Sequence, residues 1–331
     1  MENSKIEWTD HTFNPWTGCE KVSPACANCY AEAWAKRCGR DFKTRIRTKT
    51  WGEPVKWNRL AEIADNSWNY MRRDLCTDDA ELIARGFMKP ARPRVFCASL
   101  ADWLDDSVPL QWLADLLQLI RETPHLDWLL LTKRPENFDK RVGEALYLAD
   151  EDTKYWLAEW SRDEPPYNVW IGVTAENQGW ADKRIPLLFD IPARVRFLSI
   201  EPMLGPVELS AFMGECITPM DVVQKYNFGI DWIICGGESG SHARPMNPIW
   251  ASDLQWECGK VDVPFLFKQW GEWGPVPGMA ADAPAVRSGK VIRFESGHCM
   301  ERVGKKKAGR VLNCRTWDDL PLVNMLLSRP C

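Results

Sequence analysis

Short apolar runs that end in polar residues recur along the chain and predict the strands of a sheet. Each run is almost continuously hydrophobic, which is typical of parallel strands that are buried on both faces. A weaker candidate of the same kind lies near the N-terminus, at residues 5–10. The six stronger runs lie at residues 94–102, 127–135, 168–177, 195–203, 231–240 and 263–271.

Amphipathic segments between these runs predict helices. In residues 107–122, Ser107 is the expected N-cap and Pro109 fits the first turn. The spacing i, i+3, i+4, i+7 places apolar side chains on one face of this helix. That face consists of Leu113, Leu116, Leu117 and Ile120.

A second such segment, residues 247–261, has Asn247 as the expected N-cap and Gly259 as the expected stop. Strands that alternate with helices predict βαβ crossovers and a parallel sheet. Six or seven such units fit an α/β fold of the TIM-like type better than two separate sheets. We therefore predict a parallel β/α barrel, partial or complete.

Two regions interrupt this alternation. Residues 41–92 predict an irregular insertion or a helical excursion within a barrel that spans residues 1–271. Residues 272–331 begin with a stretch rich in Gly, Pro and Ala and predict a loop-rich, irregular C-terminal extension. This extension is basic, and we interpret its charge run as a solvated face. The run contains Lys305, Lys306, Lys307 and Arg310.

Composition adds limits to this picture. The net charge of −4 over 331 residues excludes a uniformly basic nucleic-acid coat, although it allows a local basic groove. No apolar run approaches the roughly 20 residues that span a bilayer, and the N-terminus lacks the pattern of an export signal. The 12 cysteines are therefore expected to be reduced thiols in a cytoplasmic protein, with a metal site where they cluster.

Nearly every predicted strand ends in charged or hydrogen-bonding residues. In parallel α/β barrels the active site lies at the C-terminal ends of the strands, so these residues predict a polar ligand bound across the mouth. Paired glycines in a "GGE" motif would let backbone N–H groups approach the ligand, and the glutamate would accept from an ammonium group. The candidate residues are Ser99, Asp102, Thr132, Lys133, Arg134, Thr174, Glu176, Asn177, Glu201, Gly236, Gly237, Glu238, Lys268 and Gln269.

A cluster of cysteines follows the first strand candidate. Cys19, Cys26 and Cys29 lie within eleven residues, and Cys38 lies farther along a predicted helix. With Cys38 as fourth ligand, the set would fit a tetrahedral structural zinc. Without it, three cysteines would hold an iron–sulfur cluster with one open iron. Cys38 lies about two and a half helical turns beyond Cys29, which favours the iron–sulfur interpretation.

A family resemblance supports this interpretation. The motifs "NPWTGC", "SPACANCYA", "LTKRP", "NVWIGVTAEN", "RFLSIEPML", "WIICGGESG" and "FKQWG" occur in this order between about residues 5 and 271. Together they resemble the phage-type three-cysteine-motif family, which has no assigned function and is similar to the radical SAM barrel proteins. Radical SAM enzymes typically space their cysteines Cys-x3-Cys-x2-Cys, whereas the first gap here is six residues. Their GGE-like motif follows the second strand, whereas the "GGESG" of this chain comes late in the sequence.

The resemblance implies a 4Fe–4S cluster on Cys19, Cys26 and Cys29, with S-adenosylmethionine bound at the open iron. It implies an enzyme that cleaves S-adenosylmethionine to a 5′-deoxyadenosyl radical for hydrogen abstraction. We expect Glu201, Lys133, Glu238 and Lys268 to be catalytic. The expected cofactor contacts are Tyr30, Ser99, Asp102, Thr132, Arg134, Thr174, Glu176, Asn177, Gly236, Gly237 and Gln269.

The expected partners are this small-molecule cofactor and an electron donor, with a nucleotide or nucleic-acid base as the suggested substrate class. The alternative is a zinc-stabilised, non-enzymatic barrel that binds a nucleic acid or a protein partner. A membrane partner is not expected.

Overall fold

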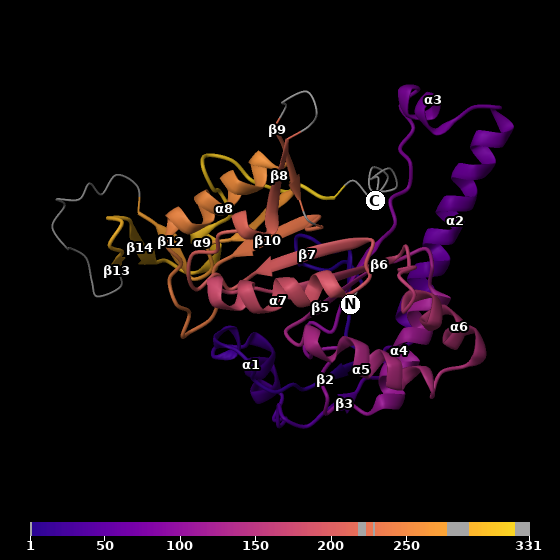
Figure 1. The fold of residues 1–331 in the computed structure, drawn as a ribbon, viewed down its shortest axis with the longest axis horizontal. Helices are drawn as coiled ribbons and strands as arrows, with labels where there is room; N and C mark the ends of the chain where they lie inside the picture. Colours follow the sequence, from indigo (N-terminus) through magenta and orange to yellow (C-terminus); the bar gives the residue numbers. More distant parts are fainter. Residues whose placement is uncertain (1, 218–222, 228, 277–290, 322–331) are drawn as a thin grey trace.

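The computed structural model describes residues 2–217, 223–227, 229–276 and 291–321. A sheet of seven parallel strands forms its centre and curls into a half-barrel, which confirms the partial form of the predicted barrel (Figure 1). All six of the stronger apolar runs form strands of this sheet. In spatial order the strands are β1 (His11–Phe13), β4 (Arg94–Cys97), β5 (Asp127–Thr132), β6 (Val169–Thr174), β7 (Val195–Ile200), β10 (Trp232–Gly236) and β11 (Phe265–Gln269).

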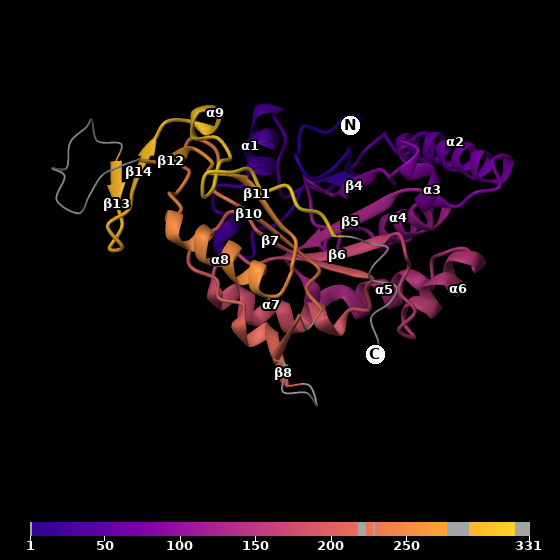
Figure 2. The same ribbon diagram turned by 90° about the horizontal axis from the view of Figure 1, so that it is seen from above.

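Helices cover the convex face of the sheet (Figure 2). The apolar stripe of α4 is fully buried in the large core between sheet and helices, as its spacing predicts. The expected cap of this helix was wrong, because Pro109 and not Ser107 occupies the N-cap position. The covering helices are α4 (Leu110–Glu122), α5 (Phe138–Leu146), α6 (Glu151–Trp160), α7 (Gln178–Asp190) and α8 (Pro248–Lys260).

Helix α8 begins as expected but ends later. The side chain of Asn247 accepts a hydrogen bond from the backbone N–H of Ile249, which confirms the predicted cap. The predicted stop at Gly259 was wrong, since the helix continues to Lys260. The carbonyl of Cys258 accepts from the N–H groups of both Val261 and Val263, so the closing turn lies beyond the glycine.

The concave face of the sheet is filled by aromatic side chains. Trp8 packs there with its ring centroid 4.5 Å from that of Phe96 and 6.1 Å from that of Trp232. Residues 5–10 therefore do not form the predicted strand; they form turns that insert Trp8 into the half-barrel, and β1 begins at His11. Phe197 lies over Gly172 of the neighbouring strand, where any Cβ would collide with the Phe197 ring.

The period of two along each strand separates this apolar floor from a polar rim. In β7, Phe197 packs into the aromatic cluster on the concave face. Ser199 and Glu201, two and four residues farther along, line a cavity above it. The concave side is thus apolar at its base and polar at the C-terminal ends of the strands.

The segment from residue 41 to residue 92 contains a short strand and two helices. Its short strand β3 (Ile46–Arg47) pairs with β2 (Trp16–Thr17). Two helices follow, and the longer one projects from the body of the molecule (Figure 1). They are α2 (Glu53–Asp74) and α3 (Asp79–Ala84).

The C-terminal extension is more regular than predicted. It contains a three-stranded antiparallel sheet of β12 (Trp273–Pro275), β14 (Cys299–Arg302) and β13 (Val291–Arg293), followed by the short helix α9 (Lys305–Ala308). Part of the predicted loop, residues 277–290, lies outside the described residues. The extension returns to edge strand β11, where the N–H of Phe267 donates to the carbonyl of Trp317 over 3.0 Å.

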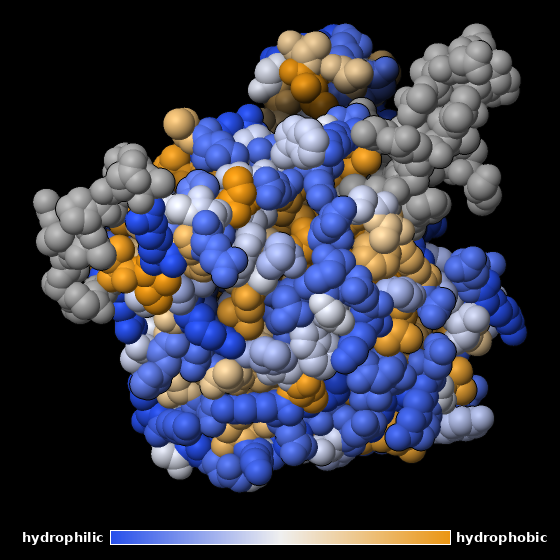
Figure 3. All heavy atoms as spheres, turned by 60° about the vertical axis from the view of Figure 1, so that its left-hand side comes forward, coloured by the Kyte–Doolittle hydropathy of each residue, from blue (hydrophilic) through white to orange (hydrophobic). Residues whose placement is uncertain are grey.

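The remaining elements are short or surround the cysteines. A hairpin extends from the body (Figure 1), and one helix follows the third cysteine. None of the described helices is long and apolar enough to cross a membrane. The face of the molecule in Figure 3 is largely hydrophilic, with hydrophobic residues in small groups. These elements are β8 (Met213–Ile217), β9 (Val223–Asn227), α1 (Tyr30–Arg37) and the 3-10 turns Pro24–Cys26, Pro135–Asn137 and Ser210–Phe212.

Candidate functional site

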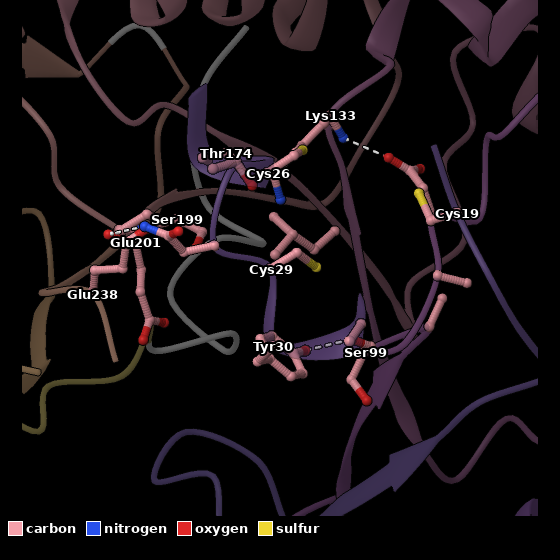
Figure 4. Close-up of a pocket in the computed structure, with 18 of the residues that line it drawn as sticks. Cys19, Cys26, Cys29, Tyr30, Ser99, Lys133, Thr174, Ser199, Glu201 and Glu238 are labelled. Carbon is pink, nitrogen blue, oxygen red and sulfur yellow. Dashed lines mark hydrogen bonds between the residues drawn. The ribbon is translucent and has the colours of Figure 1, made fainter. Parts of the chain in front are cut away.

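A cavity of about 380 Å³ lies at the C-terminal ends of the strands. The three clustered cysteines line it together with residues from six strand ends, so the structure brings together most of the residues expected from the sequence (Figure 4). Glu176, Asn177 and Gly236 are not among its lining residues. Those that line it are Cys19, Cys26, Cys29, Tyr30, Ser99, Asp102, Thr132, Lys133, Arg134, Thr174, Glu201, Gly237, Glu238, Lys268 and Gln269.

The cysteines come from one loop, residues 18–29, which we call the cysteine loop. Gly18 opens it with a φ of 101°, and a Cβ there would collide with the carbonyl oxygen of Thr44. Cys26 ends a 3-10 turn and Cys29 is the N-cap residue of α1. Cys38 is exposed at the far end of α1 and does not line the cavity.

The donor chemistry of this wall suits a thiophilic metal group. Three thiols face one cavity, and burial, with Asp102 nearby, raises the pKa of the Cys19 thiol to about 11 although Arg134 opposes the shift. Within the described ranges, no three His, Cys, Asp or Glu side chains converge as ligands of a single ion. A tetrahedral zinc would require all its sulfur ligands at about 2.3 Å from one point. A 4Fe–4S cluster binds each thiolate on a separate iron, so three cysteines can hold it and leave one iron open.

An ion pair holds the loop at Cys19. Arg134 follows β5, and its Nη1 donates to Cys19 Sγ at 3.6 Å and to Asp102 Oδ2 at 3.1 Å. Its Nη2 donates to the carbonyl of Glu20 at 2.9 Å. Asp102 also accepts from the Thr132 hydroxyl and from the N–H groups of Lys133 and Leu104.

A second ion pair holds the loop next to Cys26. Glu176 follows β6 and is fully buried; its Oε1 accepts from the N–H of Ala25 at 3.1 Å and its Oε2 from Arg184 Nη1 at 3.0 Å. The neighbouring Asn177 accepts from the N–H of Trp180 and caps α7. Neither side chain lines the cavity.

A third ion pair holds the loop next to Cys29. Glu238 follows β10, and its Oε2 accepts from Asn28 Nδ2 at 3.0 Å and from the N–H and Nε of Arg244. Its Oε1 accepts from Arg244 Nη2 at 2.6 Å, and the same nitrogen donates to the carbonyl of Pro24. Although burial alone would raise the pKa of the Glu238 carboxyl, its bonds to Arg244 and Asn28 lower this pKa overall.

The paired glycines before Glu238 serve packing. The N–H of Gly237 donates to the carbonyl of Gln269 at 2.8 Å. A Cβ on Gly237 would collide with the carbonyl of Trp270, and one on Gly236 would lie 3.4 Å from the Glu201 side chain. The glycines thus permit close approach of β10 to the chain after β11, and not of a ligand to a free N–H.

On the other side of the cavity, five residues form what we call the polar wall. Lys268 Nζ lies 2.9 Å from Glu201 Oε1, and Gln269 Nε2 donates to the same carboxylate at 3.2 Å. Two buried polar atoms here, Thr174 Oγ1 and Gln269 Oε1, have no hydrogen-bond partner among the described residues. In Figure 4 Glu201 and Ser199 lie to the left of the three cysteines. The polar wall comprises Thr174, Ser199, Glu201, Lys268 and Gln269.

Two further residues complete the rim. The Tyr30 hydroxyl donates to the carbonyl of Ser99, which ties the start of α1 to the end of β4 (Figure 4). Lys133 lines the cavity, and its ammonium group forms no ion pair with any residue that the structure describes.

Sequence reasoning missed Ser199, Asn28, Arg184 and Arg244. Ser199 could have been found, because it lies two residues before Glu201 on the same face of β7. Asn28 lies 210 residues from its partner Glu238, a separation that no local pattern signals. Arg184 and Arg244 lie only eight and six residues after Glu176 and Glu238, but the sequence does not show that their side chains turn back onto these carboxylates.

The model of one protein family, described as "Protein of unknown function (DUF5131)", matches residues 3–321 of the chain. No curated protein matches the chain, and no solved structure matches it.

Proposed function

This chain belongs to the DUF5131 family of proteins of unknown function, and we propose that it is an iron–sulfur enzyme of the radical SAM type. One observation carries the proposal. The three cysteines of the loop, and not Cys38, line the same cavity as the polar strand ends of a parallel half-barrel. Three thiol ligands leave a position of a cluster open toward that cavity.

In this proposal Cys19, Cys26 and Cys29 hold a 4Fe–4S cluster. When bound and reduced by an electron donor, it supplies the electron that splits S-adenosylmethionine into methionine and the 5′-deoxyadenosyl radical that abstracts hydrogen from a substrate. The apolar floor with Ile6, Trp8 and Phe96 keeps water from the base of the cavity.

The polar wall provides contacts for the methionine end of S-adenosylmethionine. Glu201 and the unpartnered Gln269 Oε1 are acceptors suited to an ammonium group, and Thr174 Oγ1 can donate or accept. Lys133 is a cation without a carboxylate partner in the described chain, so it suits the carboxylate of the ligand. These groups orient the ligand, and Lys268 holds Glu201 in place through their ion pair.

A nucleotide or nucleic-acid base is the substrate class we propose. Helix α9 places Lys305 at the cavity lining and exposes Lys306 and Lys307 beside it. None of these three lysines is ion-paired within the described part of the chain. Cationic side chains at the mouth of a cavity favour a substrate that carries phosphate groups.

The alternative of a zinc-stabilised, non-enzymatic barrel has less support. It needs a fourth ligand, and Cys38 is exposed at the end of α1 away from the cavity. Replacing Cys38 with Ala separates the two proposals, since only the zinc site loses its metal in this variant.

The test is reductive cleavage of S-adenosylmethionine by the anaerobically reconstituted, dithionite-reduced protein. We expect 5′-deoxyadenosine and methionine in equal amounts, and neither product from a Cys29→Ser variant. An iron-loaded, reduced protein that forms no 5′-deoxyadenosine would contradict the proposed reaction.

A further inference from the structure

We infer that Glu176 and Glu238 are positioning residues that hold Cys26 and Cys29 in the cavity wall, and that neither contacts a ligand. The inference rests on the proposed function only in treating these cysteines as metal ligands. It changes the roles expected from the sequence, which assigned Glu238 to catalysis and Glu176 to the cofactor.

The hydrogen bonds of Glu238 leave it no free acceptor position. A carboxylate has about four lone-pair sites. Glu238 receives four donors, three of them from Arg244 and one from Asn28. Any ligand ammonium would have to displace one of these bonds. Since Asn28 directly precedes Cys29, the carboxylate holds this cysteine in place instead.

Glu176 cannot reach a ligand for a different reason. It is fully buried and does not line the cavity, and its two oxygens are bound to Arg184 and to the N–H of Ala25. Ala25 directly precedes Cys26. A buried, charge-assisted bond to the backbone at this point fixes the turn that carries the second cysteine.

The two ion pairs act on neighbouring points of one short segment. Arg244 donates to the carbonyl of Pro24, one residue before the Ala25 N–H that Glu176 binds. The loop is thus clamped from β6 on one side and from β10 on the other. Glu201, in contrast, accepts only from Lys268 and Gln269 among the described residues and makes no bond to the loop.

The test measures how fast each cysteine of the metal-free, full-length protein is alkylated, with mass spectrometry to assign the sites. In Glu238→Gln and Glu176→Gln variants, the glutamine amide cannot satisfy the same donors. We expect alkylation of Cys26 and Cys29 to accelerate roughly tenfold, as for the loss of a charged hydrogen bond, with Cys38 unchanged. Glu201→Gln is the matched control, and its pattern should equal that of the wild type.

Equal alkylation rates in wild type and both variants, at unchanged thermal stability, would overturn the inference. Should Glu238→Gln fail to fold, Asn28→Ala offers a second variant. It removes the hydrogen bonds that the residue before Cys29 donates to Glu238 and to the carbonyl of His242, leaves three donors on Glu238, and should expose Cys29 in the same way. Because the assay uses metal-free protein, its outcome does not depend on cluster binding. A protein that binds no iron would contradict the proposed function but would not contradict the positioning role of Glu176 and Glu238.

Iron loading adds a second readout. On reconstitution we expect the two variants to bind less iron than the Glu201→Gln control. Full iron loading of both variants would show that the clamps do not position ligands.

Discussion

The two sides of the cavity look alike in sequence and differ in how their polar groups are used. Around the cysteine loop, Asp102 and Glu238 each receive four hydrogen bonds from the protein. On the polar wall, Glu201 accepts from two side chains, and Thr174 Oγ1 and Gln269 Oε1 have no partner in the described part of the chain. The first side uses its charges to hold a loop, and the second leaves hydrogen-bonding groups unpaired beside the cavity.

The largest expected effect lies on the cysteine side. Cys26→Ser removes one of three thiolate ligands, so we expect an anaerobically reconstituted protein to lose nearly all bound iron. The matched variant Cys38→Ser, on the exposed end of α1, should keep it. Iron and acid-labile sulfide analysis checks both. Iron loss in Cys38→Ser would show that a ligand lies outside the cavity, and it would contradict the assignment of the metal site to the cysteine loop.

The next effect concerns the aromatic side chains on the concave face, which lie below both sides of the cavity. Gly172→Ala forces a methyl group against the Phe197 ring, and we expect it to lower the free energy of unfolding by roughly 3 kcal/mol, at the upper end for overpacking. Gly143→Ala within α5 meets no neighbouring atom and should stabilise by about 0.5–1 kcal/mol. Urea unfolding of both variants measures this. An unchanged free energy of unfolding in Gly172→Ala would mean that the aromatic side chains on the concave face can rearrange around the added methyl group.

A pair of buried threonines compares the two sides directly. Thr132 donates to Asp102 at 2.7 Å and accepts from the N–H of Arg134 at 2.9 Å, so Thr132→Val should cost about 1–3 kcal/mol of unfolding free energy. Thr174 lies at the equivalent end of β6, but its hydroxyl has no described partner. Thr174→Val should therefore leave stability unchanged or slightly higher. Equal losses in the two variants would remove the distinction between the sides.

The smallest effect is expected for Glu201. Glu201→Gln should weaken binding of S-adenosylmethionine roughly tenfold, as for the loss of one charged hydrogen bond, with a small change in melting temperature. Equilibrium binding to the reconstituted protein measures the change. Unaltered affinity would mean that the polar wall does not hold this ligand.

Much of this arrangement follows from the sequence. The near-continuous apolar runs predicted the six main strands correctly, because parallel strands that are buried on both faces are hydrophobic along their whole length. The polar residues after these runs predicted the cavity, because parallel strands bring their C-terminal ends to one edge. The C-terminal sheet was missed, since its strands are only three or four residues long.

The use of each polar group could not be predicted. Glu238 and Glu201 both follow apolar strands, and local sequence does not distinguish a saturated carboxylate from an available one. Part of the difference comes from partners far away in the chain: Asn28 lies 210 residues from Glu238, and Ala25 lies 151 residues from Glu176. The other three donors on Glu238 come from Arg244, only six residues on, through a turn that the sequence does not show. Likewise, residues 5–10 have the composition of a strand, but the packing of Trp8 against Phe96 and Trp232 on the concave face determines their conformation.

Metal analysis of the anaerobically purified full-length protein tests the central claim most directly. We predict a brown protein with about four irons and an equal amount of labile sulfide per chain, as for a 4Fe–4S cluster. A colourless protein that carries one zinc per chain would contradict it.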